Sequence, residues 1–181
     1  TASKAAIRLG VTKMSANRCF DEIEYLNVDI LGMKGKSRVI TVPADIQKLW
    51  NDVRVILRNP VIARYELKED IQLGKKAGIT ALCEYSLLSD NEYPTYAITK
   101  KEITESGIRK MKQVHSGEEI GCVVLELGYF IDFKNKKLED PLSVTLSLTE
   151  SEKQDERIGI SIKRMLEEYV LSLIHISEPT R

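Results

Sequence analysis

The sequence predicts an α+β protein built from two parts, residues 1–58 and 59–170. Apolar residues recur at helical spacing near the start, two β-branched segments then flank a glycine turn, and the remainder mixes helical and strand patterns. The charges divide in the same way. Residues 1–58 hold ten Lys/Arg and six Asp/Glu, whereas the whole chain of 181 residues is formally neutral. This division favours different partners for the two parts, although a surplus of this size also arises by chance on solvated surfaces.

The composition excludes several classes of protein. At 43% hydrophobic residues the chain can bury a core, and its apolar runs are too short to span a bilayer. Cys19, Cys83 and Cys122 are scattered and form no Cys-x-x-Cys pair, so neither a disulfide framework nor a zinc site is indicated. We therefore expect a cytoplasmic protein that uses no membrane, metal or cofactor.

The chain begins with the pattern of two helices joined by a tight turn. Thr1 or Ser3 can cap a first helix that runs to about Leu9, and Gly10 supplies the turn. Thr12 can cap a second helix. The second helix carries an apolar stripe at offsets of three and four residues, formed by Ala16, Cys19, Phe20, Ile23 and Leu26.

The start of this second helix is polar and basic, as a DNA-recognition helix requires. Arginine and lysine can bind guanine or phosphate, and asparagine can bind adenine. The candidate recognition residues are Thr12, Lys13, Ser15, Asn17 and Arg18. The same pattern also occurs in ordinary helical hairpins, so the helices alone do not decide the function.

Residues 27–43 read as two short strands around a basic turn, "KGKSR". A flexible basic hairpin directly after a recognition helix is what a winged helix-turn-helix uses to follow a phosphate backbone. The candidate wing residues are Lys34, Lys36, Ser37 and Arg38. Two alternatives stay open: lysines that only discourage edge pairing, and a winged helix that binds proteins alone.

The rest of the chain predicts a mixed domain after one more helix. Residues 43–57 fit a helix with Pro43 near its start, and Pro60 marks the domain boundary. The segment 139–148 is ambiguous, because Pro141 can open a helix while its β-branched content favours a strand. The other expected elements are strands at 61–67, 93–99 and within 120–133, and helices from about Thr80, over Lys100–Ser106 and over 151–170.

Two of these segments resemble the AbiEi-type antitoxins, the regulators of type IV toxin–antitoxin systems. They are "AGITALCEYSLLSDNEYPTYAI" (77–98) and "DPLSVTLSLTES" (140–151). The resemblance implies an N-terminal winged helix that binds operator DNA through Lys13, Ser15, Asn17 and Arg18. It also implies a C-terminal domain that neutralises a nucleotidyltransferase-type toxin. The family pattern has a further helix before this point, so we expect the first domain to be truncated at its N-terminus.

We do not expect an enzyme. Glu118, Glu119 and Asp132 lie near predicted strands, with His115 and Ser116 beside them in the sequence, but "HSGEE" reads more simply as a solvated loop. Phosphate-binding, nucleophile-elbow and zinc-protease motifs are absent from the sequence, and "GKKAG" lacks the spacing of a phosphate loop.

The expected function is therefore a sequence-specific DNA-binding transcriptional regulator, the antitoxin and autoregulator of a toxin–antitoxin operon. The expected partners are double-stranded DNA and a cognate toxin, with a homodimer suggested by operator symmetry. The alternatives are a ligand-sensing winged-helix repressor, whose acidic domain binds a metabolite, and a winged helix used only for protein assembly.

The last residues, "LSLIHISEPTR" (171–181), resemble no part of a regulator. Residue for residue they are similar to the translation of a transposase-type sequencing adapter. We expect this segment to derive from the adapter, which removes His175 and Ser177 from the candidate site residues.

Overall fold

The computed structural model describes residues 1–41, 45–54, 56–89, 92–129, 131 and 136–171. It confirms the α+β class, with helices and two separate sheets. The chain divides into two compact units, residues 1–57 and 58–181, called the N-terminal and C-terminal units below. Four residues with an expected role, Pro43, Asp132, His175 and Ser177, lie outside the described residues, as does nearly all of the tail.

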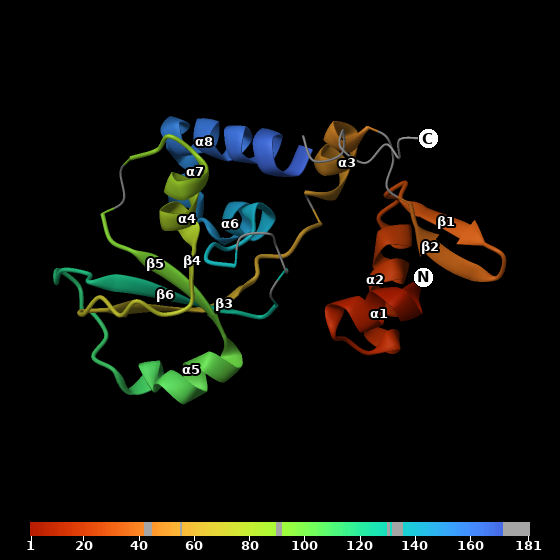
Figure 1. The fold of residues 1–181 in the computed structure, drawn as a ribbon. Coiled ribbons are helices and arrows are strands. Elements are labelled where there is room, and N and C mark those ends of the chain that lie inside the picture. The colour runs from red at the N-terminus through yellow and green to blue at the C-terminus, as the bar shows by residue number, and fades with distance from the viewer. Residues whose placement is uncertain (42–44, 55, 90–91, 130, 132–135, 172–181) are drawn as a thin grey trace. The chain divides into compact units, whose positions relative to one another are not determined.

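The N-terminal unit contains two helices, a hairpin and a third helix, in the order that the sequence predicts (Figure 1). Its elements are α1 (Ala2–Leu9), α2 (Lys13–Tyr25), β1 (Leu31–Lys34), β2 (Ser37–Ile40) and α3 (Ile46–Val53). Thr1 caps α1, and Thr12 caps α2 by accepting a hydrogen bond from the Ser15 N–H. Between these helices Gly10 has φ +64°, a left-handed conformation that glycine adopts at little cost.

The core of the N-terminal unit is small, and part of the predicted stripe on α2 lies outside it. Ala16 and Phe20 are buried against α1, whereas Cys19 is exposed and Leu26 is 42% exposed. Cys19 and Leu26 lie at the edge of the stripe, beyond the narrow arc that the alanine-rich face of α1 covers. The apolar stripe that the spacing predicts is therefore wider than the part of α2 that the core covers.

The C-terminal unit is built on a four-stranded mixed sheet with the strand order β3-β6-β5-β4. β6 pairs antiparallel with β3 and parallel with β5, and β4 pairs antiparallel with β5. The strands are β3 (Val61–Leu67), β4 (Lys75–Lys76), β5 (Thr95–Thr99) and β6 (Cys122–Leu127). β4, which is only two residues long, was not predicted from the sequence.

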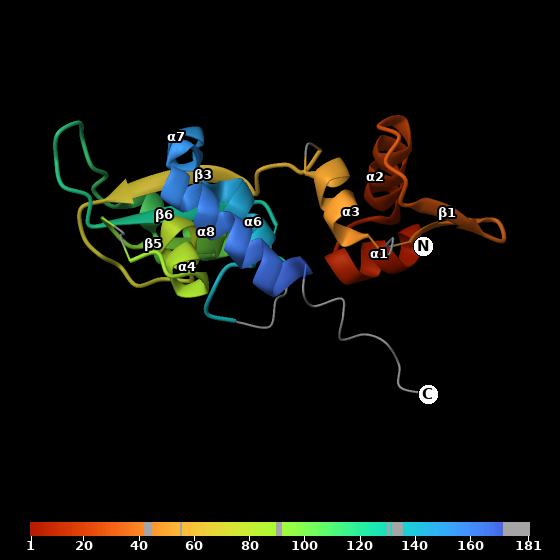
Figure 2. The same ribbon diagram turned by 90° about the horizontal axis from the view of Figure 1, so that it is seen from above.

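Helices cover both faces of this sheet (Figure 1), and Figure 2 looks down on the helices of one face. On one face α5 (Lys100–Ser106) and the short helix η1 (Ile108–Lys110) contribute Ile103 and Ile108 to a core with Ile98 and Val124. The helices on the other face form a core of their own. They are α4 (Gly78–Tyr85), α6 (Pro141–Ser147), α7 (Glu150–Gln154) and α8 (Glu156–Leu166), followed by one π turn at Glu167–Leu171.

Local interactions decide the form of two helical segments. The ambiguous segment 139–148 forms α6, because the Asp140 carboxylate accepts hydrogen bonds from the N–H groups of Leu142 and Ser143 and Pro141 occupies the first turn. The single helix expected over 151–170 is interrupted at Asp155, whose backbone is extended and whose side chain caps α8. Among the described helices, none combines the length and the apolarity needed to cross a membrane.

A buried carboxylate lies at the start of α6. Glu139 is 1% exposed, and neither of its side-chain oxygens has a hydrogen-bond partner of normal geometry among the described residues. Burial, reinforced by the charge of Asp140, raises the pKa of Glu139 to about 8; the nearby N–H of Gly78 and hydroxyl of Ser147 act in the opposite direction without offsetting it. The neutral carboxyl is therefore the stable form in the folded protein.

This arrangement predicts a pH-dependent stability. The folded state holds the Glu139 proton more tightly than the unfolded chain, so its stabilising contribution is complete below the ordinary carboxyl pKa and is lost as the pH rises through about 8. Glu139→Gln should abolish that loss. At about pH 9 the variant should be more stable than the wild type by a few kcal/mol, at roughly 1.4 kcal/mol per pKa unit. Urea unfolding from about pH 5 to about pH 9 measures the difference.

Glu119→Gln serves as the control for this experiment, because Glu119 is exposed. It should leave the pH profile of the wild type unchanged. Parallel profiles for the wild type and Glu139→Gln would show that Glu139 is ionised in the folded state, contrary to this assignment.

Candidate functional site

A hollow in the N-terminal unit brings together several residues that the sequence nominates. Its volume is about 290 Å³, and it lies among the start of α1, the first turns of α2 and the tip of the hairpin. We call it the hairpin hollow. Its lining residues are Thr1, Ala2, Ser3, Lys13, Asn17, Lys36, Ser37 and Arg38. Helix and hairpin residues that are far apart in sequence therefore share one polar surface.

The helix period explains which recognition-helix candidates reach the hollow. Lys13 and Asn17 are four residues apart, so they lie one above the other on the side of α2 that lines it. Arg18 is exposed but lies about 100° farther round the helix. The Ser15 side chain is engaged with the helix cap, with its Oγ 2.9 Å from Thr12 Oγ1. The hollow thus includes Lys13 and Asn17 and leaves out Thr12, Ser15 and Arg18.

The hairpin presents its lysines at a sharp turn. Lys34 pairs with Ser37, leaving Gly35 and Lys36 as the two turn residues, and Gly35 has φ +61°. Two-residue hairpin turns require such a conformation, which glycine supplies. Both lysines are exposed, and Lys36 lines the hollow. Two positive charges are therefore available to solvent at this end of the hairpin.

Arg38 is placed differently from the two lysines. Its Nη1 lies 2.6 Å from Asp21 Oδ1 and 3.0 Å from Glu24 Oε2, both on α2. The guanidinium also lies over the Phe20 ring, 5.8 Å from its centroid. The hydrogen bond to Asp21 and that to Glu24 raise the pKa of Arg38 although desolvation opposes them. The charge of Arg38 is therefore balanced within the unit.

Sequence reasoning missed the two carboxylates that hold Arg38. Asp21 and Glu24 are three residues apart on α2, a spacing that places them side by side on the helix surface. The spacing therefore could have predicted a pair of neighbouring carboxylates on the surface of α2. What the sequence could not show is which cation on the hairpin would meet the pair, because strand-to-helix placement is not a local property.

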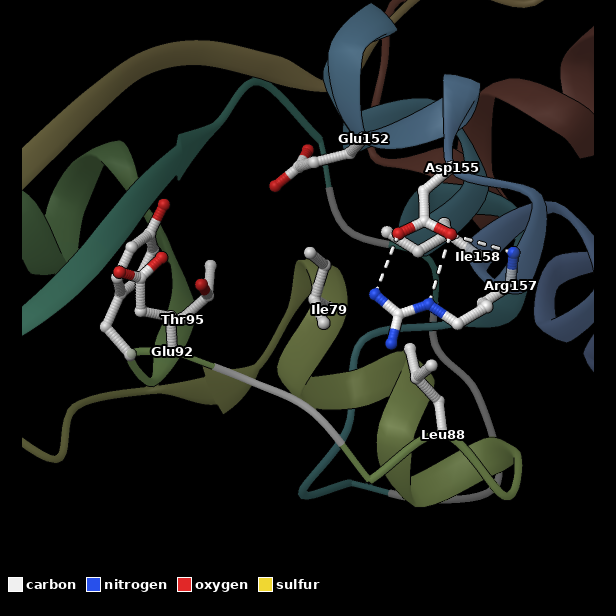
Figure 3. A pocket seen from close by; sticks show the side chains of 9 residues that line it. Ile79, Leu88, Glu92, Thr95, Glu152, Asp155, Arg157 and Ile158 are labelled. Carbon is white, nitrogen blue, oxygen red and sulfur yellow. Dashed lines mark hydrogen bonds and ion pairs between the residues drawn. The ribbon is translucent and has the colours of Figure 1, made fainter.

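A second hollow, of about 430 Å³, lies in the C-terminal unit (Figure 3). Ile79, Leu88 and Ile158 give it apolar walls. Its polar lining is largely engaged in local structure: Arg157 Nη2 binds the Asp155 carboxylate at 3.0 Å, and Glu152 accepts hydrogen bonds from Thr149 in a helix-capping box. The other lining residues are Glu92, Tyr93 and Thr95. The volume is in the range of small-molecule sites, but the polar groups do not form a catalytic arrangement.

Four of the residues considered for catalysis, His115, Ser116, Glu118 and Glu119, lie together in an exposed loop. Glu118 Oε2 accepts a hydrogen bond from the His115 N–H at 2.9 Å, and Glu118 also pairs with Lys68. The hydrogen bond from Lys68, then that from His115, lowers the pKa of Glu118. His115, Ser116 and Glu119 are exposed. Within the described part of the chain, no three His, Cys, Asp or Glu side chains are grouped so that they could hold a metal ion.

Comparison with known proteins adds no assignment. No protein-family model, curated protein or solved structure matches the chain. Segments 77–98 and 140–151, on which the expected family resemblance rests, include α4, β5 and α6, and their apolar residues Ala81, Leu82 and Val144 are fully buried. These segments belong to the packing of the C-terminal unit, so the case for a function depends on the geometry of the hairpin hollow.

Proposed function

We propose that the N-terminal unit is a winged helix-turn-helix that binds double-stranded DNA, with α2 as the recognition helix and the β1–β2 hairpin as the wing. The protein is then a sequence-specific transcriptional regulator. The observation that carries the proposal is the hairpin hollow, where Lys13 and Asn17 of the helix meet Lys36 of the hairpin. Asparagine can bind adenine in the major groove, while lysines on either side neutralise phosphates.

The charges of the N-terminal unit also support this proposal, although the number of exposed lysines near the hollow is small. Lys13, Lys34 and Lys36 are exposed, whereas the charge of Arg38 is offset by Asp21 and Glu24. Three free cations near one surface release about three counterions on binding. This supports a weak non-specific affinity of one protein molecule for DNA. Contacts with bases and the binding of a second protein molecule would add specific affinity.

Within this function, we propose the antitoxin of a toxin–antitoxin operon as the biological role. The resemblance of α4, β5 and α6 to AbiEi-type antitoxins supports it. A second candidate is a ligand-sensing repressor, which the 430 Å³ hollow of the C-terminal unit favours because its lining combines apolar side chains with the polar Glu92 and Thr95. The third, a winged helix that only assembles with proteins, leaves the lysines of the hairpin without a role.

DNA binding should depend strongly on salt. In fluorescence anisotropy with a random duplex, the logarithm of the association constant should fall with the logarithm of the salt concentration with a slope of roughly −3. The reason is counterion release by Lys13, Lys34 and Lys36. Binding that does not change with salt, or no binding, would refute the DNA-binding proposal and favour protein-only assembly.

Substitutions in the hollow should separate base recognition from backbone contact. Asn17→Ala should lower affinity for a selected duplex and leave affinity for random DNA unchanged. Lys36→Ala should weaken both and reduce the salt slope by about 1. Lys48→Ala, which removes the same charge from the exposed surface of α3, is the matched control and should change neither. If Arg18→Ala alone alters sequence preference, the DNA-facing side of α2 is rotated away from the hollow.

The biological role has its own test. We expect a nucleotidyltransferase-like reading frame beside the gene, and a complex that survives gel filtration when the two proteins are co-expressed. A solitary gene whose product changes its DNA affinity on adding a small molecule would instead support the ligand-sensing repressor.

A further inference from the structure

The hairpin needs an attachment to α2 to hold a fixed orientation. It is a two-stranded sheet with four residues in each strand, and such a sheet is marginally stable in water by itself. Leu31, at its base, packs against the small core of the unit. The tip, with Lys34 and Lys36, is exposed. The angle between the tip and α2 therefore depends on contacts made along the strands.

Arg38 provides such a contact from the middle of the hairpin. One guanidinium nitrogen lies within hydrogen-bonding distance of both Asp21 and Glu24, and the guanidinium carbon lies over the Phe20 ring, 5.8 Å from its centroid. Phe20 is 2% exposed and fixed by the core, and the Arg38 side chain is only 28% exposed. Arginine suits this task because its planar group can stack on a ring while it binds carboxylates.

We propose that Arg38 is a positioning residue: it fixes the hairpin against α2 so that Lys36 and Lys13 face the same DNA backbone, and it does not itself contact DNA. This inference rests on the proposed DNA-binding function. It differs from the sequence-based expectation, in which Arg38 was a wing residue that binds phosphate directly. In the structure Nη1 of Arg38 already binds both Asp21 and Glu24 of α2, whereas Lys34 and Lys36 are exposed.

The first arm of the test uses no DNA. Amide hydrogen exchange over residues 31–40 should become several-fold faster in Arg38→Gln, because the hairpin loses its attachment. Lys36→Gln, which removes the same charge at the tip of the same hairpin, should leave that exchange unchanged. The amides of α2 are the internal reference for folding. Unchanged hairpin exchange in Arg38→Gln would overturn the proposal.

The second arm measures DNA affinity in a double-mutant cycle. Arg38→Gln should weaken binding to all duplexes, and most of this penalty should disappear in a protein that already carries Lys34→Ala and Lys36→Ala. A positioning residue acts through those lysines, so removing them removes its effect. A penalty that persists in full in that background would show a direct contact and overturn the proposal.

A further variant protects the test against a folding defect. Asp21→Asn combined with Glu24→Gln removes the other side of the contact and keeps Arg38, and it should also speed hairpin exchange while α2 stays protected. Slow hairpin exchange in this variant would count against the proposal. If the wild-type protein binds no DNA, the proposed function fails, and the exchange arm still decides whether Arg38 holds the hairpin.

Discussion

Burial of β6 on both faces is the constraint from which the C-terminal unit follows. All six residues of β6 are buried, so both faces of the sheet must be covered at this strand. Both edges of β6 must also be paired with other strands. β3 and β5 pair with its edges, α5 covers one face, and the group of α4, α6 and α8 covers the other. The strand even holds Glu126, which is 2% exposed. Burial favours its neutral form, but hydrogen bonds from Tyr65 and Arg109 outweigh burial and hold its pKa below the ordinary value.

The N-terminal unit is stabilised in a different way, because its core is so small. Three alanines and Phe20 make up most of it, and alanine buries little apolar area. Capping hydrogen bonds at Thr1 and Thr12, and the contact of Arg38 with α2, therefore contribute a larger share of its stability. Each is modest: a helix cap is worth about 1 kcal/mol, and an ion pair that is open to solvent is weakened by screening. The polar contacts that shape the hairpin hollow are thus also contacts on which the fold of this unit depends.

Local sequence signals predicted most of the helices and strands, whereas contacts between residues far apart in the sequence determine the geometry of the site. The helix at Lys100–Ser106 and the strand at Val61–Leu67 have the predicted bounds, because a Thr99 capping box and a β-branched start mark them. The break at Asp155 was missed, since the apolar pattern continues across it. For the site, the sequence predicted Lys13, Asn17 and Arg18 as one group of recognition residues. The helix period places Arg18 on a different side of α2 from Lys13 and Asn17. The engagement of Arg38 with α2 could not be predicted, because it depends on how a strand lies against a helix.

The hairpin hollow is lined mainly by exposed polar side chains, whereas α4 and α6 bury apolar side chains in the core of the C-terminal unit. Lys13, Asn17 and Lys36 bury little apolar surface, so replacing them costs the fold little. Ala81, Leu82 and Val144 are fully buried, so few replacements are tolerated there. The two sets can therefore diverge at different rates during evolution. Chains that share this core can differ in what their hairpin hollows bind, and similarity in the core does not by itself transfer a binding preference from one chain to another.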